Sequence, residues 1–591
     1  MPNNPGNKEK KNTRPAVDAI ISYCKKYWPL MFIAVLCAAA SAVFSVISPD
    51  YISQITETIQ NGIGMTGVNI DMSEIARIGG ILIAMYGGGC ILGYLQAFLM
   101  NHISCNMGKQ MRSDISSKIN RTPLNYFDTH NFGDTLSRVT NDVDTVSQSV
   151  NSSIVTLVSA TVTFIGCIVM MFVTEWRMAL TAIGSSLFGF LLMGGILGKS
   201  QKYFSARQQS LAEVNAHIEE YYAGQNIVRA YNAEPRNLAV FQESNEKLRQ
   251  DTLRAEFLSG LMMPLMGFVG NFGYAAVCIV GAALAFGGSI PFSVVVAFML
   301  YVRLFTSPLS QLAQGVSGMQ SAVAASGRVA EFLAEEELSD ESSKTEKLDR
   351  VKGNVTFDHI SFGYTPDKTI IHDFSAEIKA GQKVAIVGPT GAGKTTLVNL
   401  LMRFYELNKG RISVDGVPLD SITRENIHDI FGMVLQDTWL FEGSIRDNLN
   451  FGKTNISDER LMEICRQCGL KHFVDTLPEG LDTVLSDNLT VSAGQKQLLT
   501  IARAMAENAP VLILDEATSS VDTRTEAKIQ KAMNALTAGR TSFVIAHRLS
   551  TIKDADLILY MEGGDVKETG NHETLMNMHG RYEALYNSQF A

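Results

Sequence analysis

Residues 383–401 read KVAIVGPTGAGKTTLVNLL, and this stretch decides the fold of the second half of the chain. It fits the pattern G-x4-G-K-[ST] at every fixed position, with an apolar strand before it and an apolar helix after it. Glycines let backbone N–H groups close around phosphates at a helix N-terminus. Lys394 is expected to reach the β/γ-phosphates, and the Thr395 hydroxyl to ligate Mg²⁺. The predicted nucleotide-binding residues here are Gly388, Pro389, Thr390, Gly391, Ala392, Gly393, Lys394, Thr395 and Thr396.

A second motif, VLILDE at 511–516, lies further along the chain. Its continuous apolar run predicts a strand buried on both faces of a parallel sheet. Asp515 emerges at the end of that strand, where its carboxylate can hold Mg²⁺, and Glu516 is placed to polarise the attacking water. An Asp-Glu pair after a strand can also cap a helix, but its position downstream of a phosphate-binding loop favours catalysis.

The first half of the chain predicts a membrane domain. Four runs without Asp, Glu, Lys or Arg reach the roughly 20 residues that cross a bilayer core, and a fifth, 257–302, is long enough for two helices around the turn GGSIP at 287–291. We therefore expect six spans near 28–48, 78–101, 151–174, 178–198, 261–285 and 291–314. No ionisable residue is expected in the middle of any span, which argues against a proton-coupled pump.

Loop charges orient these spans. The tail 1–26 and the long loops 103–150 and 199–256 are rich in Lys and Arg, whereas the loop 50–77 is mostly acidic. Both termini and both long loops are therefore expected in the cytoplasm of a multi-pass plasma-membrane protein. Helical spacing continues through the long loops, so the membrane helices are expected to extend beyond the bilayer. The net charge of -9 argues against a nucleic-acid-binding surface, which needs excess positive charge.

With these motifs in order, the chain resembles the ATP-binding cassette (ABC) exporter half-transporters of the multidrug and lipid-pump type, and bacterial heterodimeric multidrug exporter subunits most of all. The resemblance covers nearly the whole length. It is carried by SFGY, the loop at 388–395, MVLQD, VSAGQKQLLTIARA, LILDEATS, SSVD and IAHRLSTI, and by NYFDTHNFGDTLSRVTNDVD at 125–144. It implies an all-α six-helix transmembrane domain at 27–315, a linker at 316–350 and an α/β P-loop NTPase domain at 351–591.

The resemblance also implies roles for single residues. Tyr364 stacks on adenine, Gln436 contacts Mg²⁺ and water, and His547 holds the γ-phosphate. Ser492, Gly494 and Gln495 open a helix that caps the ATP of a partner subunit. The implied set is completed by Glu516 as the catalytic base, by Asp522 in the nucleotide site, and by Thr395, Gln436 and Asp515 as metal ligands.

The signature motif departs from the family. The usual sequence is LSGGQ, whereas this chain has VSAGQ at 491–495, so Ala493 adds a methyl group where the backbone should approach phosphate closely. The stretch TVLSDNLT before it also lacks the family's glutamate-and-glycine loop. Because the other catalytic motifs are intact, the departure favours a heterodimer in which only one of two ATP sites is weakened. A homodimer that tolerates Ala493 is the alternative.

The expected function is ATP-driven export of amphipathic or hydrophobic, drug-like or lipid-like compounds by alternating access. The cofactors are ATP and Mg²⁺, and the partners are a second half-transporter, the lipid bilayer and the transported small molecule. One alternative is import through the same fold. Another is a channel or regulator gated by ATP, against which Glu516 and His547 argue because both serve sustained turnover. A soluble ATPase with a membrane anchor would not need six spans.

Overall fold

The computed structural model describes residues 14–590 except 65–66, 69, 366, 452–455, 486–490, 516–521 and 546–551. The chain divides into two units. The helical unit contains residues up to 120 together with 132–335, and the mixed α/β unit contains 121–131 together with 336–591. The short segment 121–131 therefore packs with a unit that begins more than 200 residues later in the sequence.

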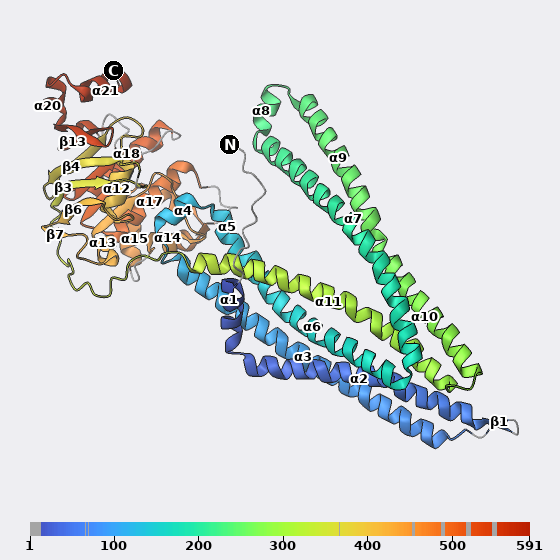
Figure 1. The fold of residues 1–591 in the computed structure, drawn as a ribbon. Helices are drawn as coiled ribbons and strands as arrows, with labels where there is room; N and C mark the ends of the chain where they lie inside the picture. The colour runs from blue at the N-terminus through green and yellow to red at the C-terminus, as the bar shows by residue number, and fades with distance from the viewer. Residues whose placement is uncertain are drawn as a thin grey trace. The chain divides into compact units, whose positions relative to one another are not determined.

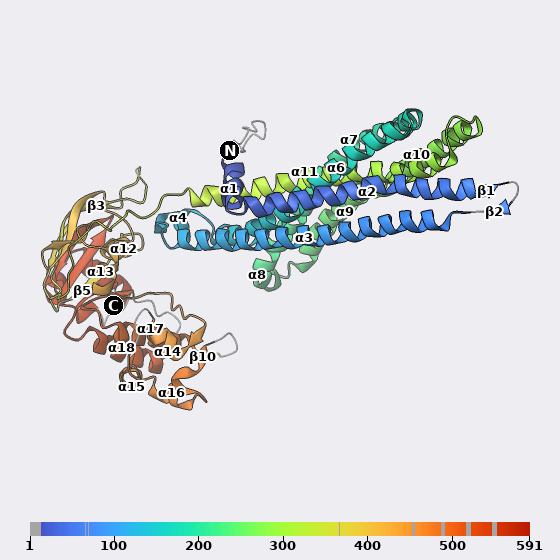
Figure 2. The same cartoon turned by 90° about the horizontal axis from the view of Figure 1, so that it is seen from below.

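The helical unit is built from long helices (Figure 1). They are α1 (Arg14–Lys25), α2 (Trp28–Gly62), α3 (Met72–Ile119), α5 (Phe132–Ser137), α6 (Val143–Thr174), α7 (Trp176–Ala223), α8 (Gln225–Ala230), α9 (Glu234–Gly260), α10 (Met262–Phe286) and α11 (Phe292–Leu333). A π-helical turn, Arg138–Asp142, joins α5 to α6, and two short strands, β1 (Ile63–Gly64) and β2 (Gly67–Val68), lie between α2 and α3. Figure 2 shows α2, α3, α6 and α11 running side by side.

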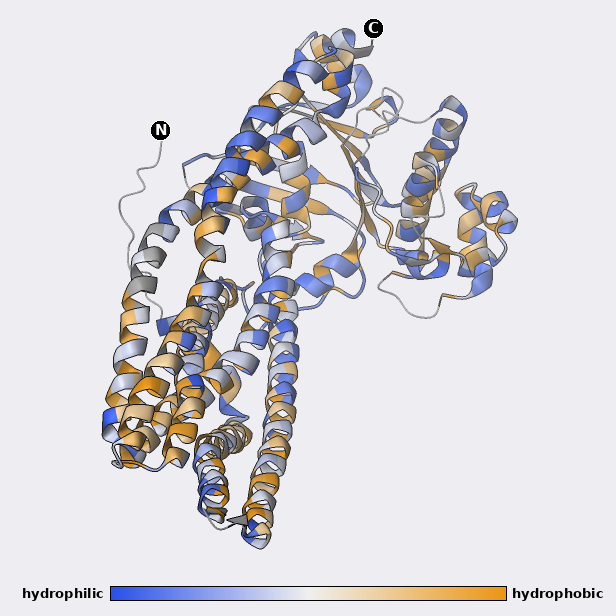
Figure 3. Cartoon of the chain, turned by 90° about the vertical axis from the view of Figure 1, so that its right-hand side faces the viewer, coloured by the Kyte–Doolittle hydropathy of each residue, from blue (hydrophilic) through white to orange (hydrophobic). Residues whose placement is uncertain are grey.

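Several helices are much longer than a bilayer is thick. The 48 residues of α3 span about 72 Å at 1.5 Å per residue, against a hydrocarbon core of about 30 Å. Five helical segments of the described residues are long and apolar enough to cross a membrane: Trp28–Gly62, Met72–Ile119, Phe132–Thr174, Gly267–Phe286 and Phe292–Leu333. Figure 3 shows that the long helices are hydrophobic over part of their length and hydrophilic elsewhere.

The remaining predicted span, 178–198, lies in α7, where several side chains fall outside the described residues. The sixth span therefore stays a prediction. The segment predicted as a linker begins inside a helix, because α11 continues to Leu333. Beyond α11, Glu341 joins the α/β unit through ion pairs of 2.8 Å to Arg403 and 2.9 Å to Arg424.

The expectation that no ionisable residue lies in mid-span is wrong for Arg303. The predicted spans rest on runs without charged residues, and the run at 257–302 ends one residue before Arg303. The helix continues through Arg303 to Leu333. Arg303 lies about 17 Å from the first residue of α11, close to half the thickness of a bilayer core. An arginine at that depth costs about 2.5–3.5 kcal/mol on insertion scales.

Helices α7 and α9 form a long antiparallel hairpin that continues into α10 (Figure 1). Polar pairs join the two helices along the hairpin. They are Arg207–Glu256 at 2.8 Å, Ser210–Asp251 at 2.7 Å, Glu213–Lys247 at 2.7 Å and His217–Asn237 at 2.8 Å. Each exposed pair is worth little alone. Together they fix the register of one helix along the other.

The α/β unit is organised around a six-stranded sheet of order β14-β13-β5-β12-β11-β8. Its strands are β5 (Lys383–Val387), β8 (Phe431–Val434), β11 (Val511–Asp515), β12 (Thr541–Ile545), β13 (Leu557–Glu562) and β14 (Asp565–Gly570). All neighbours are parallel except β13 and β14. Strands β11 and β12 are almost wholly buried. For β11 the continuous apolar run predicts this burial.

A second, antiparallel sheet has the order β4-β3-β6-β7, with β3 (Val355–Phe362), β4 (Ile371–Ile378), β6 (Lys409–Val414) and β7 (Val417–Pro418). A further pair consists of β9 (Gly443–Ser444) and β10 (Val484–Leu485). The helices are α4 (Leu124–Thr129), α12 (Lys394–Leu401), α13 (Arg424–Ile430), α14 (Ile445–Leu449), α15 (Asp458–Gln467), α16 (Lys471–Thr476), α17 (Ala493–Glu507), α18 (Thr523–Thr537), α20 (His572–Asn577) and α21 (Arg581–Phe590).

The core between the two sheets is apolar. Phe357 and Phe374 pack edge to face at 5.0 Å, and Phe357 meets Phe543 of the central sheet at 6.2 Å. Helix α12 buries Leu397 and Leu401 in the same cluster. This packing fixes α12, and with it the loop at its N-terminus.

Candidate nucleotide site

The loop 388–393 connects the end of β5 to the start of α12, as the sequence predicts. Gly388, Gly391 and Gly393 have φ values of 155°, 83° and 97°, which side chains rarely allow. At Gly388 a Cβ would also lie 2.1 Å from the carbonyl oxygen of Met561. The loop can take this shape only because its sequence supplies glycine there.

Lys394 begins α12 and folds back over the loop. Its Nζ donates to the carbonyl oxygens of Gly388 at 2.8 Å and Pro389 at 3.0 Å. Burial lowers the pKa of this amine, and the negative charge of Asp515 opposes that shift. The ammonium group is thus held at the mouth of the loop, where a phosphate group would meet it.

The carboxyl ends of the parallel strands bring the other predicted residues to the same edge. Asp515 ends β11 opposite Ile545 of β12, and Gln436 follows β8, which pairs with β11 on its other side. A pocket of about 560 Å³ opens along this edge. Its lining includes Thr390, Gly391, Ala392, Gly393, Lys394, Thr395, Thr396, Gln436 and Asp515. Hydroxyl, carboxylate and amide oxygens of this kind suit Mg²⁺, and the pocket suits a triphosphate.

Two predicted catalytic residues, Glu516 and His547, lie outside the described residues. In the sequence, Glu516 follows Asp515 directly, and His547 comes two residues after Ile545. Their roles stay predictions.

Tyr364, predicted to stack on adenine, is not among the residues that line this pocket. Its hydroxyl donates to Thr396 Oγ1 at 3.3 Å, so it contacts the first turn of α12. Its ring is half-buried and meets the ring of Tyr405 edge to face at 4.9 Å. The ring of Tyr364 also meets Phe362 edge to face at 5.1 Å. Tyr364 thus lies beside the phosphate-binding helix, between two aromatic neighbours.

The signature residues open α17, as predicted. Ser492 is the N-cap, and its Oγ accepts from Gln495 N at 3.2 Å, while Ser492 N donates to Gln495 Oε1 at 2.9 Å. This capping box satisfies the helix end within the chain. Gly494 is buried, whereas Ala493 is exposed. The methyl group that departs from the family motif is therefore on the accessible surface of the helix end.

Asp522 caps α18. Its Oδ1 accepts from the backbone N–H groups of Arg524 and Thr525, each at 3.0 Å, and hydrogen bonds from Thr525 and Arg524 lower the pKa of its carboxyl. The structure does not bring Asp522 into the pocket lining described above. Its expected place in the nucleotide site stays a prediction.

Sequence reasoning missed one contact in the α/β unit. The hydroxyl of Tyr405 donates to the carboxylate of Asp128 on α4. Burial, and then the Asp128 charge, raise the pKa of Tyr405. The two residues are 277 positions apart, so no local pattern could reveal the pair. Sequence reasoning also missed Lys368, Thr369, Gly563 and Gly564, which line the pocket from loops with no motif.

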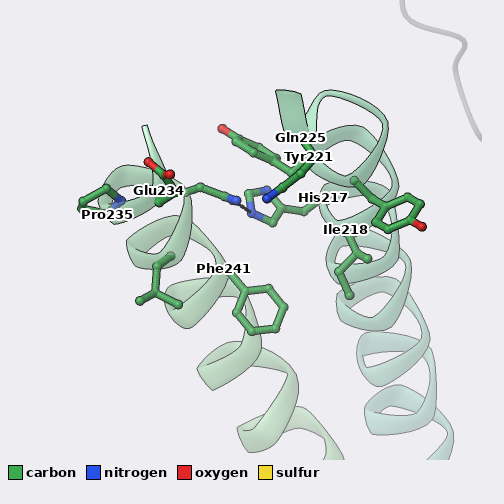
Figure 4. Close-up of a pocket in the computed structure, with 10 residues that line it drawn as sticks. His217, Ile218, Tyr221, Gln225, Glu234, Pro235 and Phe241 are labelled. Atoms are coloured by element: carbon green, nitrogen blue, oxygen red, sulfur yellow. Dashed lines mark hydrogen bonds between the residues drawn. The ribbon is translucent and has the colours of Figure 1, made fainter. Parts of the chain in front are cut away.

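A second pocket, of about 630 Å³, lies at the tip of the α7–α9 hairpin (Figure 4). His217 stands at its centre, with Tyr221 at 4.4 Å and Phe241 at 6.3 Å between ring centroids. Tyr222 and Tyr231, around α8, are among the most exposed aromatic residues of the chain. The tip presents an aromatic surface rather than a hydrophilic loop.

Each of the two units matches a known protein family. Residues 31–309 match the ABC transporter transmembrane region, and residues 371–519 match the ABC transporter domain. A fatty acid ABC transporter ATP-binding/permease protein of Mycobacterium bovis is 42% identical over 517 residues, 87% of this chain and 82% of that protein.

Two further relatives differ in their named cargo. An ATP-dependent lipid A-core flippase of Syntrophus aciditrophicus is 33% identical, over 88% of this chain and 86% of the relative. A probable multidrug resistance ABC transporter ATP-binding/permease protein of Bacillus subtilis is 32% identical, over 86% and 76%. The chain belongs to the ABC transporters of the exporter type, in which a transmembrane region and an ATP-hydrolysing domain share one polypeptide.

Proposed function

We propose that this chain is a subunit of a dimeric transporter that moves amphipathic, lipid-like or drug-like compounds across the plasma membrane by alternating access. The observation that carries the proposal is the pocket at the carboxyl edge of the six-stranded sheet, which residues 390–396, Gln436 and Asp515 line together. A site of this composition can hold a triphosphate and a divalent cation. The long helices of the first unit supply the path through the bilayer.

Each residue of the site has a distinct proposed role. Loop N–H groups and Lys394 bind the phosphates, which lowers the cost of charge developing on them. Thr395, Asp515 and Gln436 would hold Mg²⁺, which neutralises phosphate charge. Glu516 takes a proton from the attacking water, and His547 contacts the γ-phosphate. Tyr364 supplies a ring for the base.

The opposite face of the bound nucleotide is closed by a second subunit. Ser492, Gly494 and Gln495 of that subunit contact the γ-phosphate, and Asp522 lies near the same junction. Ser492 and Gln495 cap α17 in this chain, so the helix N-terminus is already ordered before a partner's phosphate reaches it. ATP thus stabilises the closed dimer, and hydrolysis releases it.

Movement passes to the membrane helices through cytoplasmic elements. Helix α4 packs within the α/β unit and is joined to it by the Asp128–Tyr405 hydrogen bond, although its sequence lies between membrane helices. The α7–α9 hairpin, with its paired side chains, is a stiff rod with an aromatic tip. We propose that this tip engages the nucleotide-binding unit of the partner subunit.

Heterodimerisation is the arrangement we favour, because Ala493 weakens the site that this chain's α17 completes. Both termini and the loops 103–150 and 199–256 are assigned to the cytoplasm by their basic residues. The direction is export, as for the exporter type, with import through the same fold as the second possibility. A gated channel would not need an intact hydrolytic set.

The test is ATP hydrolysis and transport by the purified full-length dimer in proteoliposomes. We expect Mg²⁺-dependent hydrolysis that rises with amphipathic compounds, together with ATP-dependent movement of the stimulating compound. Flux that continues when ATP is replaced by a non-hydrolysable analogue would favour a channel. Cysteine labelling near Asn215 tests topology, and accessibility from outside intact cells would overturn the assignment.

A further inference from the structure

We propose that the ion pair between Asp142 and Arg328 is the contact through which movement of helix α4 reaches helix α11, and that Arg328 is a positioning residue for substrate-coupled ATP hydrolysis. The proposal rests on the transport function proposed above and names a contact that joins hydrolysis to transport. The pair lies in the helical unit, where the segment that follows α4 meets α11.

The path from α4 along the chain is short. Helix α4 belongs to the α/β unit, where its Asp128 accepts a hydrogen bond from Tyr405. Two residues separate α4 from α5, and the π-helical turn Arg138–Asp142 (the π turn) then joins α5 to α6. Along the chain, movement of α4 therefore reaches the membrane helix α6 through the π turn.

The π turn sets the orientation of α5. It is the one π-helical turn among the residues that the structure describes, and turns of this kind occur singly inside α-helices, frequently at functional sites. Its hydrogen bonds span five residues instead of four, so it holds one residue more than an α-helical turn. One residue corresponds to a rotation of about 100° around a helix axis. A contact that fixes the π turn therefore fixes how α5 is rotated relative to α6.

Asp142 provides such a contact. It is the last residue of the π turn, is only 5% exposed, and is the one buried carboxylate in the described part of the chain. Arg328 of α11 donates to both of its oxygens, from Nε to Oδ2 at 2.9 Å and from Nη2 to Oδ1. Two parallel bonds from a planar guanidinium fix the direction of a carboxylate as well as its position. The buried carboxylate and the π turn thus coincide at one contact with α11.

A second contact holds the other end of the π turn. Arg138, its first residue, has its guanidinium 5.9 Å from the centre of the Phe332 ring. Phe332 is fully buried and lies four residues after Arg328, about one turn further along α11. Both ends of the π turn are therefore attached to successive turns of the same helix. Since α11 is one helix from Phe292 to Leu333, a shift at this end reaches its membrane-spanning part.

The stability of the fold does not by itself require this pair. A buried ion pair gives up hydration, and apolar residues of similar size often stabilise a fold as well or better. Apolar residues lack the directional hold of two charged hydrogen bonds, which can specify register. The pair is also unequal, because the Arg328 side chain is 51% exposed and the Asp142 side chain only 7%. Arg328 can therefore be replaced without leaving a cavity in the core.

The test is ATP hydrolysis and ATP-dependent uptake by the full-length dimer in proteoliposomes, with oleate and the amphipathic dye Hoechst 33342 as probes. R328Q should keep the half-saturating ATP concentration of the parent, whereas stimulation by the more effective probe should fall by about fivefold or more, as for a typical coupling between sites. D142N combined with R328Q should cost no more than the larger single loss, because both residues act through one contact. R328K keeps the charge without the planar fork and should recover part of the stimulation.

An apolar pair separates the coupling role from a purely structural one. D142L combined with R328M removes the buried charge together with its partner, so the purified protein should unfold near the temperature of the parent and still lose stimulation. R112Q is the matched control. Arg112 of α3 pairs with Asp144, two residues after Asp142, but both of these side chains are exposed, so R112Q should behave as the parent.

Full stimulation of both R328Q and the apolar pair would overturn the proposed link and leave ATP-driven transport intact. A loss of stimulation that accompanies a lower unfolding temperature in R328Q, and that the apolar pair does not share, would assign the two residues to the fold alone. A parent that hydrolyses no ATP, or that neither probe stimulates, contradicts the proposed function instead. Should R328Q not assemble, the apolar pair and R328K decide the question.

Discussion

At the scale of single residues, Lys394 offers the clearest test of the nucleotide site. Its ammonium group is held over the loop by two carbonyl oxygens, and burial already lowers its pKa. We expect K394A to weaken ATP binding by at least about tenfold, since the phosphates lose a fixed positive charge. Isothermal titration with ATP measures this. K379A removes an exposed lysine just after β4 and should bind ATP as the parent does.

The proposed role of Glu516 as the catalytic base leads to a different prediction, because a base acts after ATP has bound. E516Q should lower ATP hydrolysis by roughly 100-fold or more, the usual contribution of a general base, while ATP still binds. Steady-state phosphate release and nucleotide titration on the same sample separate the two effects. Near-normal hydrolysis by a dimer that carries E516Q in both subunits contradicts the assignment.

Single residues also show which parts of the site could be predicted from the sequence alone. The loop 388–395 and Asp515 were identified because each motif is contiguous and its chemistry is local. The contact of Tyr405 was not predicted because its partner Asp128 is 277 positions away. Arg303 escaped because a search for charge-free runs stops at the charge, although the helix continues past it. Local patterns report local geometry, whereas the contact between Tyr405 and Asp128 joins residues that are distant in the sequence.

At the scale of elements, the hydrogen bond between Tyr405 and Asp128 joins helix α4 to the rest of the α/β unit. Y405F removes the hydroxyl that donates to Asp128 but keeps the ring that packs against Tyr364 at 4.9 Å. We expect ATP affinity to change little and substrate-stimulated hydrolysis to fall by about fivefold or more, because coupling between sites is typically worth 1–3 kcal/mol, or about 5- to 150-fold. The measurement is stimulation of ATP hydrolysis by a transported amphiphile.

A double-mutant cycle checks the mechanism of that loss. If Tyr405 acts through Asp128, D128N combined with Y405F should cost no more than the larger single effect. Y582F removes a comparable hydroxyl, bonded to His572 at 2.8 Å elsewhere in the same unit, and should leave stimulation unchanged. Additive losses would mean that the two residues act independently.

The sequence predicted some of the helices and strands but not where every helix packs. Strand β11 and helix α12 follow from an apolar run and a glycine loop, and the structure confirms both. The extension of membrane helices beyond the bilayer follows from helical spacing in basic loops, and the 48 residues of α3 agree with it. The sequence did not predict that α4 packs with the α/β unit, because packing between segments far apart in the chain produces no periodic pattern in the sequence.

At the scale of the whole molecule, Ala493 decides between two kinds of dimer. In a head-to-tail sandwich, this chain's loop 388–395 and Glu516 are completed by the partner's signature helix, and this chain's α17 completes the partner's site. A homodimer carries Ala493 in both sites and weakens both equally. A heterodimer confines the weakened signature to one site, which then holds ATP for longer while the other turns over.

The exposed position of Ala493 at the N-terminus of α17 makes this testable without disturbing the fold. Expressed alone, the chain should form dimers with weak ATP hydrolysis, and A493G should raise that rate several-fold because it removes a methyl group from the approach to phosphate. A538G, at the exposed end of α18, is the matched control and should change nothing. Steady-state hydrolysis of the three purified proteins measures the difference. Full substrate-stimulated hydrolysis by the unaltered chain alone, unimproved by A493G, would show that the methyl group is tolerated and that the chain works as a homodimer.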